Sequence, residues 1–297
     1  MKKSFLTVAC IFSIFVILSS PQIIASGVRL GIKLNLHSVI PALLPFMVLT
    51  NIMMKYNLCE YISFIFYPIL SKFFKISKNG CFAAIIGFTC GYPMGAKIIG
   101  DLYSSKLICD SEAQYLITFC NNCSISFLLN YIAFNCLAPA IETPKILVLV
   151  YFPPLISGFI NKFILKPEIK PTLNSKYSPS CTNPITSAIK SISILSVYII
   201  CFTVISNYIA SLHFIPLDIK CISAGLFEIT SGSKLISSMP KVNLPKNFLI
   251  LVFTVFGGFS IMFQSFATLS ETSLKKYYII GKIEQLIIMC LLYILIL

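Results

Sequence analysis

The amino-acid sequence predicts an all-α, polytopic membrane protein. Of its 297 residues 57% are hydrophobic and only 11% are charged, whereas about a quarter of the residues of a soluble domain are charged. The apolar residues fall in blocks close to the ~20 residues that an α-helix needs to cross the hydrocarbon core. Long unbroken apolar runs fit helices, because strands of a membrane barrel would alternate in polarity. We therefore expect roughly nine or ten membrane segments.

The excess of positive charge is explained by the membrane surface. The chain has 23 Lys and Arg residues against 10 Asp and Glu residues, and the lysines stand singly or in small groups at the ends of apolar segments. Lysines in such places orient helices and meet anionic headgroups of the bilayer. The sequence has no basic stripe with interleaved aromatic residues, so we expect no nucleic acid partner.

The cysteines do not indicate a metal or a cofactor. Most of the 12 lie inside apolar blocks, where a cysteine behaves as a small buried hydrophobe. The CxxC of Cys120 and Cys123 would need further zinc ligands, and the chain offers only His37 and His213. The sequence also lacks a nucleotide-binding loop, a GxSxG and an HExxH motif, so we expect no enzyme.

The first segments are ordinary membrane helices with some irregularity. Residues 1–26 begin with a lysine-led apolar run, which we interpret as an uncleaved first helix with a cytoplasmic N-terminus rather than a signal peptide. Residues 35–54 form a second segment that Pro41 and Pro45 should kink. The short block 60–71 either spans the bilayer or lies at its interface.

The next segment, 81–99, is broken by the sequence GYPMGAK. Glycine and proline in the middle of a membrane segment favour a discontinuous helix or a re-entrant hairpin. Irregular backbone at that depth survives only when it is buried in protein or lines a water-filled cavity. The candidate site residues of this break are Gly91, Tyr92, Pro93, Gly95 and Lys97.

The following segment, 115–138, carries polar side chains that are costly in lipid, and its candidate site residues are Asn121, Asn122 and Ser124. Residues 146–165 then complete an N-terminal membrane half, 1–165.

The composition changes abruptly after this half. Residues 166–186 are rich in proline and lysine and form a polar linker. The C-terminal membrane half, 187–297, follows, with apolar segments at 187–210, 217–238, 247–269 and 278–297.

The two halves contain a short internal repeat. A shift of 137 residues lays Gly95-x-Lys97 over Gly232-x-Lys234, and a shift of 136 lays Asn121-Asn122 over Gly257-Gly258. In both halves the doublet precedes a Ser-Ile-x-Phe sequence, which begins at Ser124 in the first half and at Ser260 in the second. Breaks at corresponding places in two halves are typical of transporters with a binding site near the midplane. Whether the repeats are inverted stays open at this point.

These residues suit a small organic anion. Two broken helices would direct free N–H groups and positive dipole ends into one cavity, and Lys97 and Lys234 would neutralise carboxylates. Neutral hydrogen bonds would come from Asn121, Asn122, Ser124, Ser260 and Gln264.

Each of these assignments has a simpler alternative. Lys97 can pair with Asp101 one turn on, and Lys234 can reach a lipid headgroup. The polar side chains can serve helix contacts. Glu228 is the candidate proton or cation carrier, and its alternative is a plain counter-charge.

Five blocks of the sequence carry a resemblance to a known family: SVIPALLPFMVL, GYPMGAKIIGDLY, SEAQYLITFCNNCSISFL, GLFEITSG and FGGFSIMFQ. In this order, they resemble the sporulation integral membrane proteins of the YlbJ (SpoVV) type, which carry the nucleoside-recognition or Gate domain. The resemblance implies a protein of the outer forespore membrane that moves dipicolinate, a compact aromatic dianion, for a normal spore cortex. The alternatives are a structural protein of the same membrane and a nucleoside carrier. The oligomeric state stays open.

Overall fold

The computed structural model describes residues 2–56, 58–137, 141–169, 183–239, 245–269 and 271–296. The elements of the N-terminal half are α1 Lys2–Ser19, α2 Pro21–Leu34, the π-helical η1 Asn35–Val39, α3 Ile40–Lys55, α4 Cys59–Phe74, α5 Lys78–Thr89, α6 Met94–Ser104, α7 Asp110–Ile117, α8 Ile125–Phe127, the π-helical η2 Leu128–Cys136 and α9 Thr143–Leu165. Those of the C-terminal half are α10 Pro184–Ser211, α11 Leu217–Phe227, α12 Ile229–Ser238, α13 Lys246–Phe256, α14 Gly258–Thr268 and α15 Thr272–Ile296.

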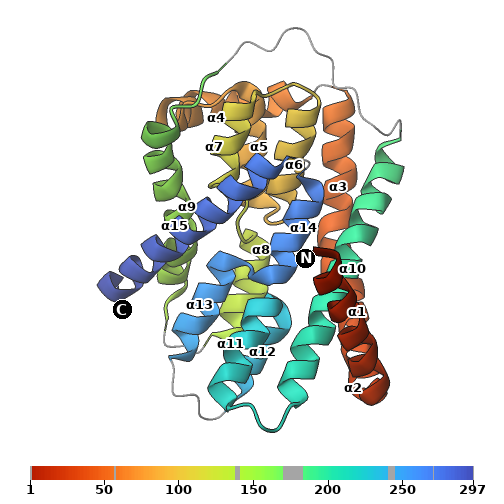
Figure 1. Ribbon diagram of the computed structural model, residues 1–297. Helices are drawn as coiled ribbons and strands as arrows, with labels where there is room; N and C mark the ends of the chain where they lie inside the picture. The colour runs from red at the N-terminus through yellow and green to blue at the C-terminus, as the bar shows by residue number, and fades with distance from the viewer. Residues whose placement is uncertain are drawn as a thin grey trace.

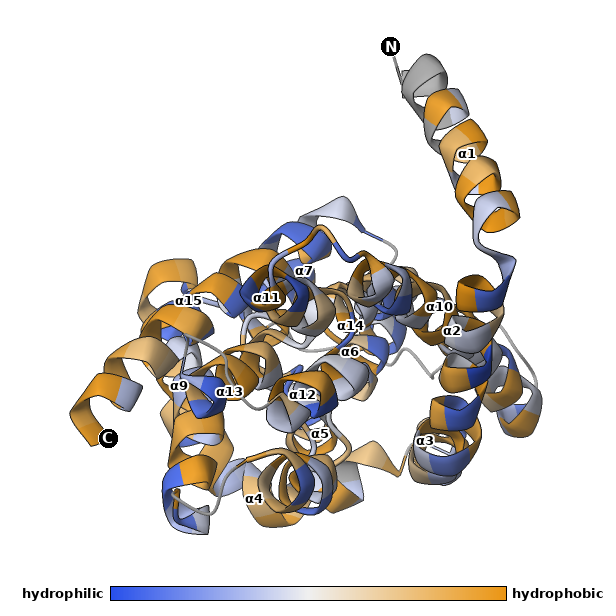
Figure 2. Cartoon of the chain, turned by 90° about the horizontal axis from the view of Figure 1, so that it is seen from below, coloured by the Kyte–Doolittle hydropathy of each residue, from blue (hydrophilic) through white to orange (hydrophobic). Residues whose placement is uncertain are grey.

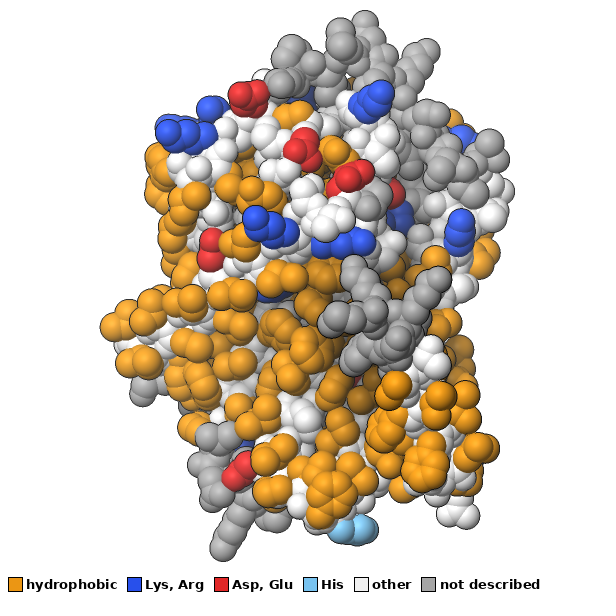
Figure 3. Space-filling view, viewed as in Figure 1, with side chains coloured by type: hydrophobic (Ala, Val, Ile, Leu, Met, Phe, Trp, Pro, Cys, Tyr) orange, Lys and Arg blue, Asp and Glu red, His pale blue; other side chains and the backbone are white. Residues whose placement is uncertain are grey.

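The predicted class, an all-helical polytopic membrane protein, is confirmed for the described residues. They hold five stretches long and apolar enough to cross a membrane: Pro21–Lys55, Thr143–Leu165, Pro184–Ser211, Lys246–Thr268 and Thr272–Ile296. The surface agrees with a bilayer, since Figure 3 shows charged side chains gathered at the upper end of the molecule and a broad apolar face below them. Apolar residues also cover the outer helices when the molecule is seen from below (Figure 2).

The second predicted segment is part of one long helical run from α2 to α3. The run does not stop at the prolines. It passes through the π-helical turn η1 just before Pro41. Because Pro41 has no N–H, the carbonyl one turn earlier loses its usual partner, and a π-turn accommodates that loss. The helix α1, in contrast, projects away from the other helices (Figure 2).

The helix α4 answers part of the question left open for residues 60–71. It has 16 residues, which corresponds to about 24 Å of helix and is short for a ~30 Å hydrocarbon core. It lies at the upper end of the molecule (Figure 1), and Tyr61, Phe64 and Ile65 are each more than 70% exposed. These features favour a helix at the membrane interface.

The predicted segments 146–165, 187–210 and 278–297 are the continuous helices α9, α10 and α15, whereas the other four are pairs of half-helices, two pairs in each half of the chain. In the N-terminal half, α5 and α6 form a hairpin, and α7 is followed by a break and by α8 and η2. In the C-terminal half, α11 and α12 form the hairpin, and α13 and α14 are the two parts of the broken helix. The predicted counterparts Lys97 and Lys234 lie on α6 and α12, as the repeat requires.

The two repeats have opposite orientations. In Figure 1 the hairpin α5–α6 occupies the upper half of the molecule and the hairpin α11–α12 the lower half. The first broken helix starts at the top with α7 and runs downward, whereas the second starts low with α13 and ends high with α14 (Figure 1). This is the arrangement of an inverted-topology repeat, in which the breaks of both halves meet near the middle of the bilayer.

A separate group of helices flanks the repeats. The helix α10 packs on α2 and α3, and small residues allow the close approach: a Cβ added to Gly27 or Gly31 would lie within 3 Å of a Cα atom of α10. Asn35 stabilises the contact between η1 and α10, since its Nδ2 donates to the carbonyl of Ser196 at 3.2 Å. Of the predicted linker 166–186, residues 170–182 lie outside the described part of the chain.

Candidate functional site

Four interruptions of helices meet in the middle of the molecule. They lie at 90–93 between α5 and α6, at 118–124 between α7 and α8, at Glu228 between α11 and α12, and at Gly257 between α13 and α14. Gly257 and Gly258 have φ of 89° and 74°, a left-handed conformation that glycine adopts without a steric penalty. Each interruption leaves the N-terminal N–H groups of the following half-helix without partners in that helix.

Asn121 ties the two repeats together at this point. Its Oδ1 accepts a hydrogen bond from the backbone N–H of Ala96 in the first turn of α6, at 3.0 Å. Its Nδ2 donates to Oγ of Ser265 in α14, also at 3.0 Å. Asn121 is only 1% exposed, so it acts as a distant N-cap for α6 and as a bond between the halves.

We expect Asn121→Ala to destabilise the protein by about 1–3 kcal/mol, because it leaves the buried Ala96 N–H without its acceptor. Chemical unfolding in detergent micelles measures this loss. The matched control is Asn130→Ala on η2, where the asparagine is exposed and the expected change is about 0.5 kcal/mol or less. Equal stabilities of the two variants would contradict the bridging role of Asn121.

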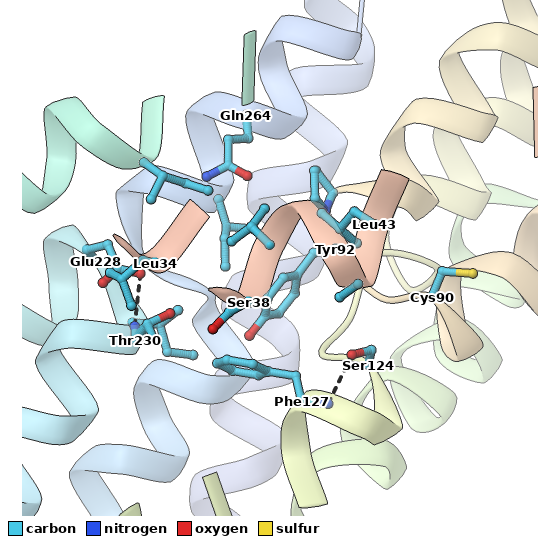
Figure 4. Close-up of a pocket in the computed structure, with 16 residues that line it drawn as sticks. Leu34, Ser38, Leu43, Cys90, Tyr92, Ser124, Phe127, Glu228, Thr230 and Gln264 are labelled. Atoms are coloured by element: carbon cyan, nitrogen blue, oxygen red, sulfur yellow. Dashed lines mark hydrogen bonds between the residues drawn. The ribbon is translucent and has the colours of Figure 1, made fainter. Parts of the chain in front are cut away.

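A cavity of about 110 Å³ lies where the breaks meet the flanking helices. We call it the central cavity, and Figure 4 shows its lining side chains. They come from α2, η1, α3, α10 and both repeats: Leu34, Ser38, Val39, Ala42, Leu43, Cys90, Tyr92, Pro93, Ser124, Phe127, Ile199, Glu228, Ile229, Thr230, Ile261 and Gln264.

Five of the predicted site residues line this cavity, and they represent both halves: Tyr92, Pro93, Ser124, Glu228 and Gln264. Ser124 caps α8 by accepting from the Phe127 N–H at 3.2 Å. Gln264 is 3% exposed, and its Nε2 donates to Oγ of Ser260 at 2.9 Å. Ser260 itself is buried and supports Gln264 without lining the cavity.

Glu228 is the charged residue of the lining. It is 4% exposed, and its carboxylate accepts from the backbone N–H groups of Thr230 at 2.9 Å and Ser231 at 2.6 Å. These N–H groups lie in the first turn of α12, so Glu228 is the N-cap of that half-helix and its charge offsets the positive end of the dipole. Among the described lining residues none is Lys or Arg.

Neither predicted lysine lines the central cavity. Lys97 is buried, and its Nζ donates to Oδ2 of Asp101 at 2.6 Å and to Oδ1 of Asn51 on α3 at 3.1 Å. The alternative i,i+4 pairing of Lys97 is therefore present. Lys234 is exposed on α12. The assignment of these two lysines to substrate carboxylates stays a prediction.

The predicted glycines hold the breaks against each other. A Cβ on Gly91 would lie 2.5 Å from the Ser124 nitrogen, and one on Gly95 would lie 1.9 Å from the Cys120 carbonyl oxygen. In the second repeat, a Cβ on Gly232 would lie 2.4 Å from Gly225 of α11. These glycines therefore allow backbones to touch. Gly257 and Gly258 supply the turn described above.

Asn122 lies next to the cavity without lining it. Its Nδ2 donates to the Phe119 carbonyl at 2.6 Å, and its backbone carbonyl accepts from the Tyr92 N–H at 2.5 Å. Its Oδ1 is buried and has no partner among the described residues. A buried amide oxygen in that state is available to a water molecule or a bound ligand.

Sequence reasoning missed two parts of the site. Ser38 lines the cavity from η1, and the signal for it was the pair of prolines that follows, since π-turns recur at functional sites. Lys282, a lysine inside the last apolar segment, lies 5.9 Å from the centre of the Tyr92 ring. The rule that ionisable residues in membrane segments are costly could have identified it.

The fold and the cavity define the class of this chain: a polytopic helical membrane protein with inverted, broken-helix repeats. Comparison with known proteins identifies a matching family and a similar protein. Residues 36–135 match the family described as Gate, nucleoside recognition. Over 91% of its length the chain is 24% identical to the sporulation integral membrane protein YlbJ of Bacillus subtilis (strain 168), of which the match covers 76%. No solved structure gives a significant match.

The resemblance that the sequence blocks indicate is therefore confirmed. The chain is similar to YlbJ over most of its length, and the Gate match covers the stretch from η1 to η2. That stretch includes the whole first repeat hairpin and the first broken helix, so the part of the chain with a family match is also the part that builds one side of the central cavity.

Proposed function

We propose that this protein transports a small organic anion through the central cavity, and that the anion is dipicolinate, moved across the outer forespore membrane for the spore cortex. We also propose that the protein is not an enzyme. The observation that carries the proposal is the convergence of both repeats on one cavity, because inverted repeats with broken helices are the construction that transporters use for a midplane site.

Half-helix N-termini favour an anion as the substrate. The first residues of α8 and α12 border the cavity through their caps, Ser124 and Glu228, and Pro93 caps α6. The N-terminal ends of α6 and α8 carry partial positive charge, whereas Glu228 accepts from N–H groups in the first turn of α12 and offsets the positive end of that half-helix. Gln264 and Ser124 add neutral donors that can hold carboxylate oxygens.

A nucleoside is the second candidate. The matched family is described as nucleoside recognition, and the described cavity lining contains hydroxyl and amide groups, one carboxylate and no lysine or arginine. Such a lining also fits a neutral, hydroxyl-rich ligand. The two candidates differ in the charge of the substrate, which a transport assay separates directly.

The proposal is tested by uptake of labelled dipicolinate into proteoliposomes that contain the purified protein. We expect uptake that excess unlabelled dipicolinate abolishes and that nucleosides leave unchanged. Gln264→Leu should lower the uptake by about tenfold or more, the value of one hydrogen bond to a charged group. The matched control is Gln114→Leu on α7, which does not line the cavity and should transport as the wild type does.

Other outcomes are equally informative. Competition by nucleosides would favour the second candidate, and movement of neither compound would favour a structural protein of the membrane. In spore-forming cells, the double variant Lys97→Met, Lys234→Met decides the role of the two lysines. Unchanged spore dipicolinate at normal protein levels would remove both from the site.

A further inference from the structure

Lys282 is a lysine buried inside the helix bundle. It lies near the middle of α15 and is 3% exposed. Its Nζ donates to the Val255 carbonyl at 3.1 Å and to Oε1 of Gln285 at 3.2 Å. Among the described residues no carboxylate forms an ion pair with it. Burying a lysine without an acidic partner inside a membrane protein costs free energy, and such residues mark functional sites.

The partners of Lys282 place it at the breaks. Val255 belongs to the last turn of α13, so its carbonyl is one of the C-terminal acceptors that the helix itself does not satisfy. Gln285, one turn further along α15, donates from Nε2 to the carbonyl of Thr118, the C-cap of α7, at 2.7 Å. One face of α15 therefore caps the first half of both broken helices, one from each repeat.

Gly281 makes this contact possible. A Cβ added at Gly281 would lie 2.2 Å from the Thr118 carbonyl oxygen, so only glycine lets α15 approach the end of α7 this closely. The pair Lys282 and Gln285 is thus held in a fixed position relative to both breaks.

Tyr92 is near Lys282 and also lines the central cavity. The Lys282 Nζ lies 5.9 Å from the centre of the Tyr92 ring, within the range of a cation–π contact. The same tyrosine lines the cavity, as Figure 4 shows. The ammonium group is therefore one aromatic ring away from the cavity, in an interior where water does not screen its charge.

We propose that Lys282 is the cation that gives the central cavity its preference for organic anions, acting on the bound anion through the ring of Tyr92. This inference rests on the proposed transport function and names the residue that selects the charge of the substrate. Lys282 is a positioning and selectivity residue here, because it does not itself line the cavity.

The test compares two probes of the same shape in proteoliposomes, labelled dipicolinate and the neutral pyridine-2,6-dicarboxamide. Lys282→Met should lower dipicolinate uptake by about tenfold or more and leave uptake of the diamide within about twofold of the wild type. Lys282→Gln removes the charge but keeps donors for the Val255 carbonyl, so it should behave in the same way even if the methionine variant folds poorly. Lys282→Arg should keep the wild-type preference.

Two controls separate the charge from the packing. Lys276→Met removes a positive charge at an exposed position of the same helix, and the preference should not change. Gln285→Leu breaks the bond to Thr118 and keeps the charge of Lys282, so it should lower the stability and leave the preference intact. If a folded Lys282→Met or Lys282→Gln variant keeps the wild-type ratio of dipicolinate uptake to diamide uptake, the inference about Lys282 is wrong and the proposed function still stands. Transport of neither probe by the wild type would overturn the proposed function as well.

Discussion

Gly95→Ala should prevent normal folding, with a loss of stability above about 3 kcal/mol. The Cβ would lie 1.9 Å from the Cys120 carbonyl oxygen and 3.1 Å from the Cα of Asn121. Gly87 on the other arm of the hairpin approaches the same carbonyl equally closely. The break between α7 and α8 therefore packs tightly between α5 and α6, and its backbone atoms leave no room for a side chain at either glycine.

The sign of this effect is diagnostic. In an exposed helix the same substitution would stabilise by about 1 kcal/mol, because alanine is the better helix former. Ser104→Ala on the exposed end of the same helix α6 is the control and should change the stability by about 0.5 kcal/mol or less. The measurement is the yield of monodisperse protein and its unfolding in detergent. A Gly95→Ala variant as stable as the wild type would show that the hairpin α5–α6 does not pack tightly on the break between α7 and α8.

The breaks were predictable because they depend on local chemistry. Glycine and proline in the sequence GYPMG interrupt a helix whatever surrounds it, and Gly257-Gly258 does the same in the second half. The offset between the halves then placed Lys97 and Lys234 on equivalent half-helices, which the structure bears out. The inversion of the repeats could not be read in this way, because it depends on whether α4 crosses the bilayer, and a 16-residue apolar helix fits either case.

The partners of the charged residues were harder to predict than the breaks. The pairing of Lys97 with Asp101, the simpler alternative from the sequence, is a local i,i+4 contact. The contact of Lys97 with Asn51 joins positions 46 residues apart, and no local pattern encodes it. The direction in which a lysine points decides whether it faces a cavity, and it follows from the packing of distant helices. The same holds for Lys282, whose contact with the Val255 carbonyl joins α15 to the end of α13.

Glu228→Gln should strongly lower the proton-driven accumulation of dipicolinate while leaving its exchange across the membrane. This expectation rests on the sequence-based prediction that Glu228 is the coupling residue; it is the carboxylate of the described cavity lining, and here we take the carried ion to be a proton that moves together with the anion. A deprotonated carboxylate repels a bound anion, whereas the protonated acid can donate a hydrogen bond to it. Glutamine imitates the protonated form and cannot release the proton, so a bound substrate can still move but no gradient can drive it.

The experiment separates this role from that of a simple helix cap. Accumulation driven by an imposed pH gradient should fall by about tenfold or more, and exchange of labelled for unlabelled dipicolinate should stay within about threefold. Glu112→Gln is the matched control, since Glu112 is also buried at 1% exposure and accepts a backbone N–H, that of Ser77, at 2.6 Å, but lies outside the cavity. If both variants lose only stability, by about 0.5–2 kcal/mol as expected for a lost cap, then Glu228 serves only as the N-cap of α12 and the coupling site lies elsewhere. If only Glu228→Gln separates accumulation from exchange, the carboxylate at the second break is the proton carrier, because the two residues share burial and backbone bonding and differ in their access to the cavity.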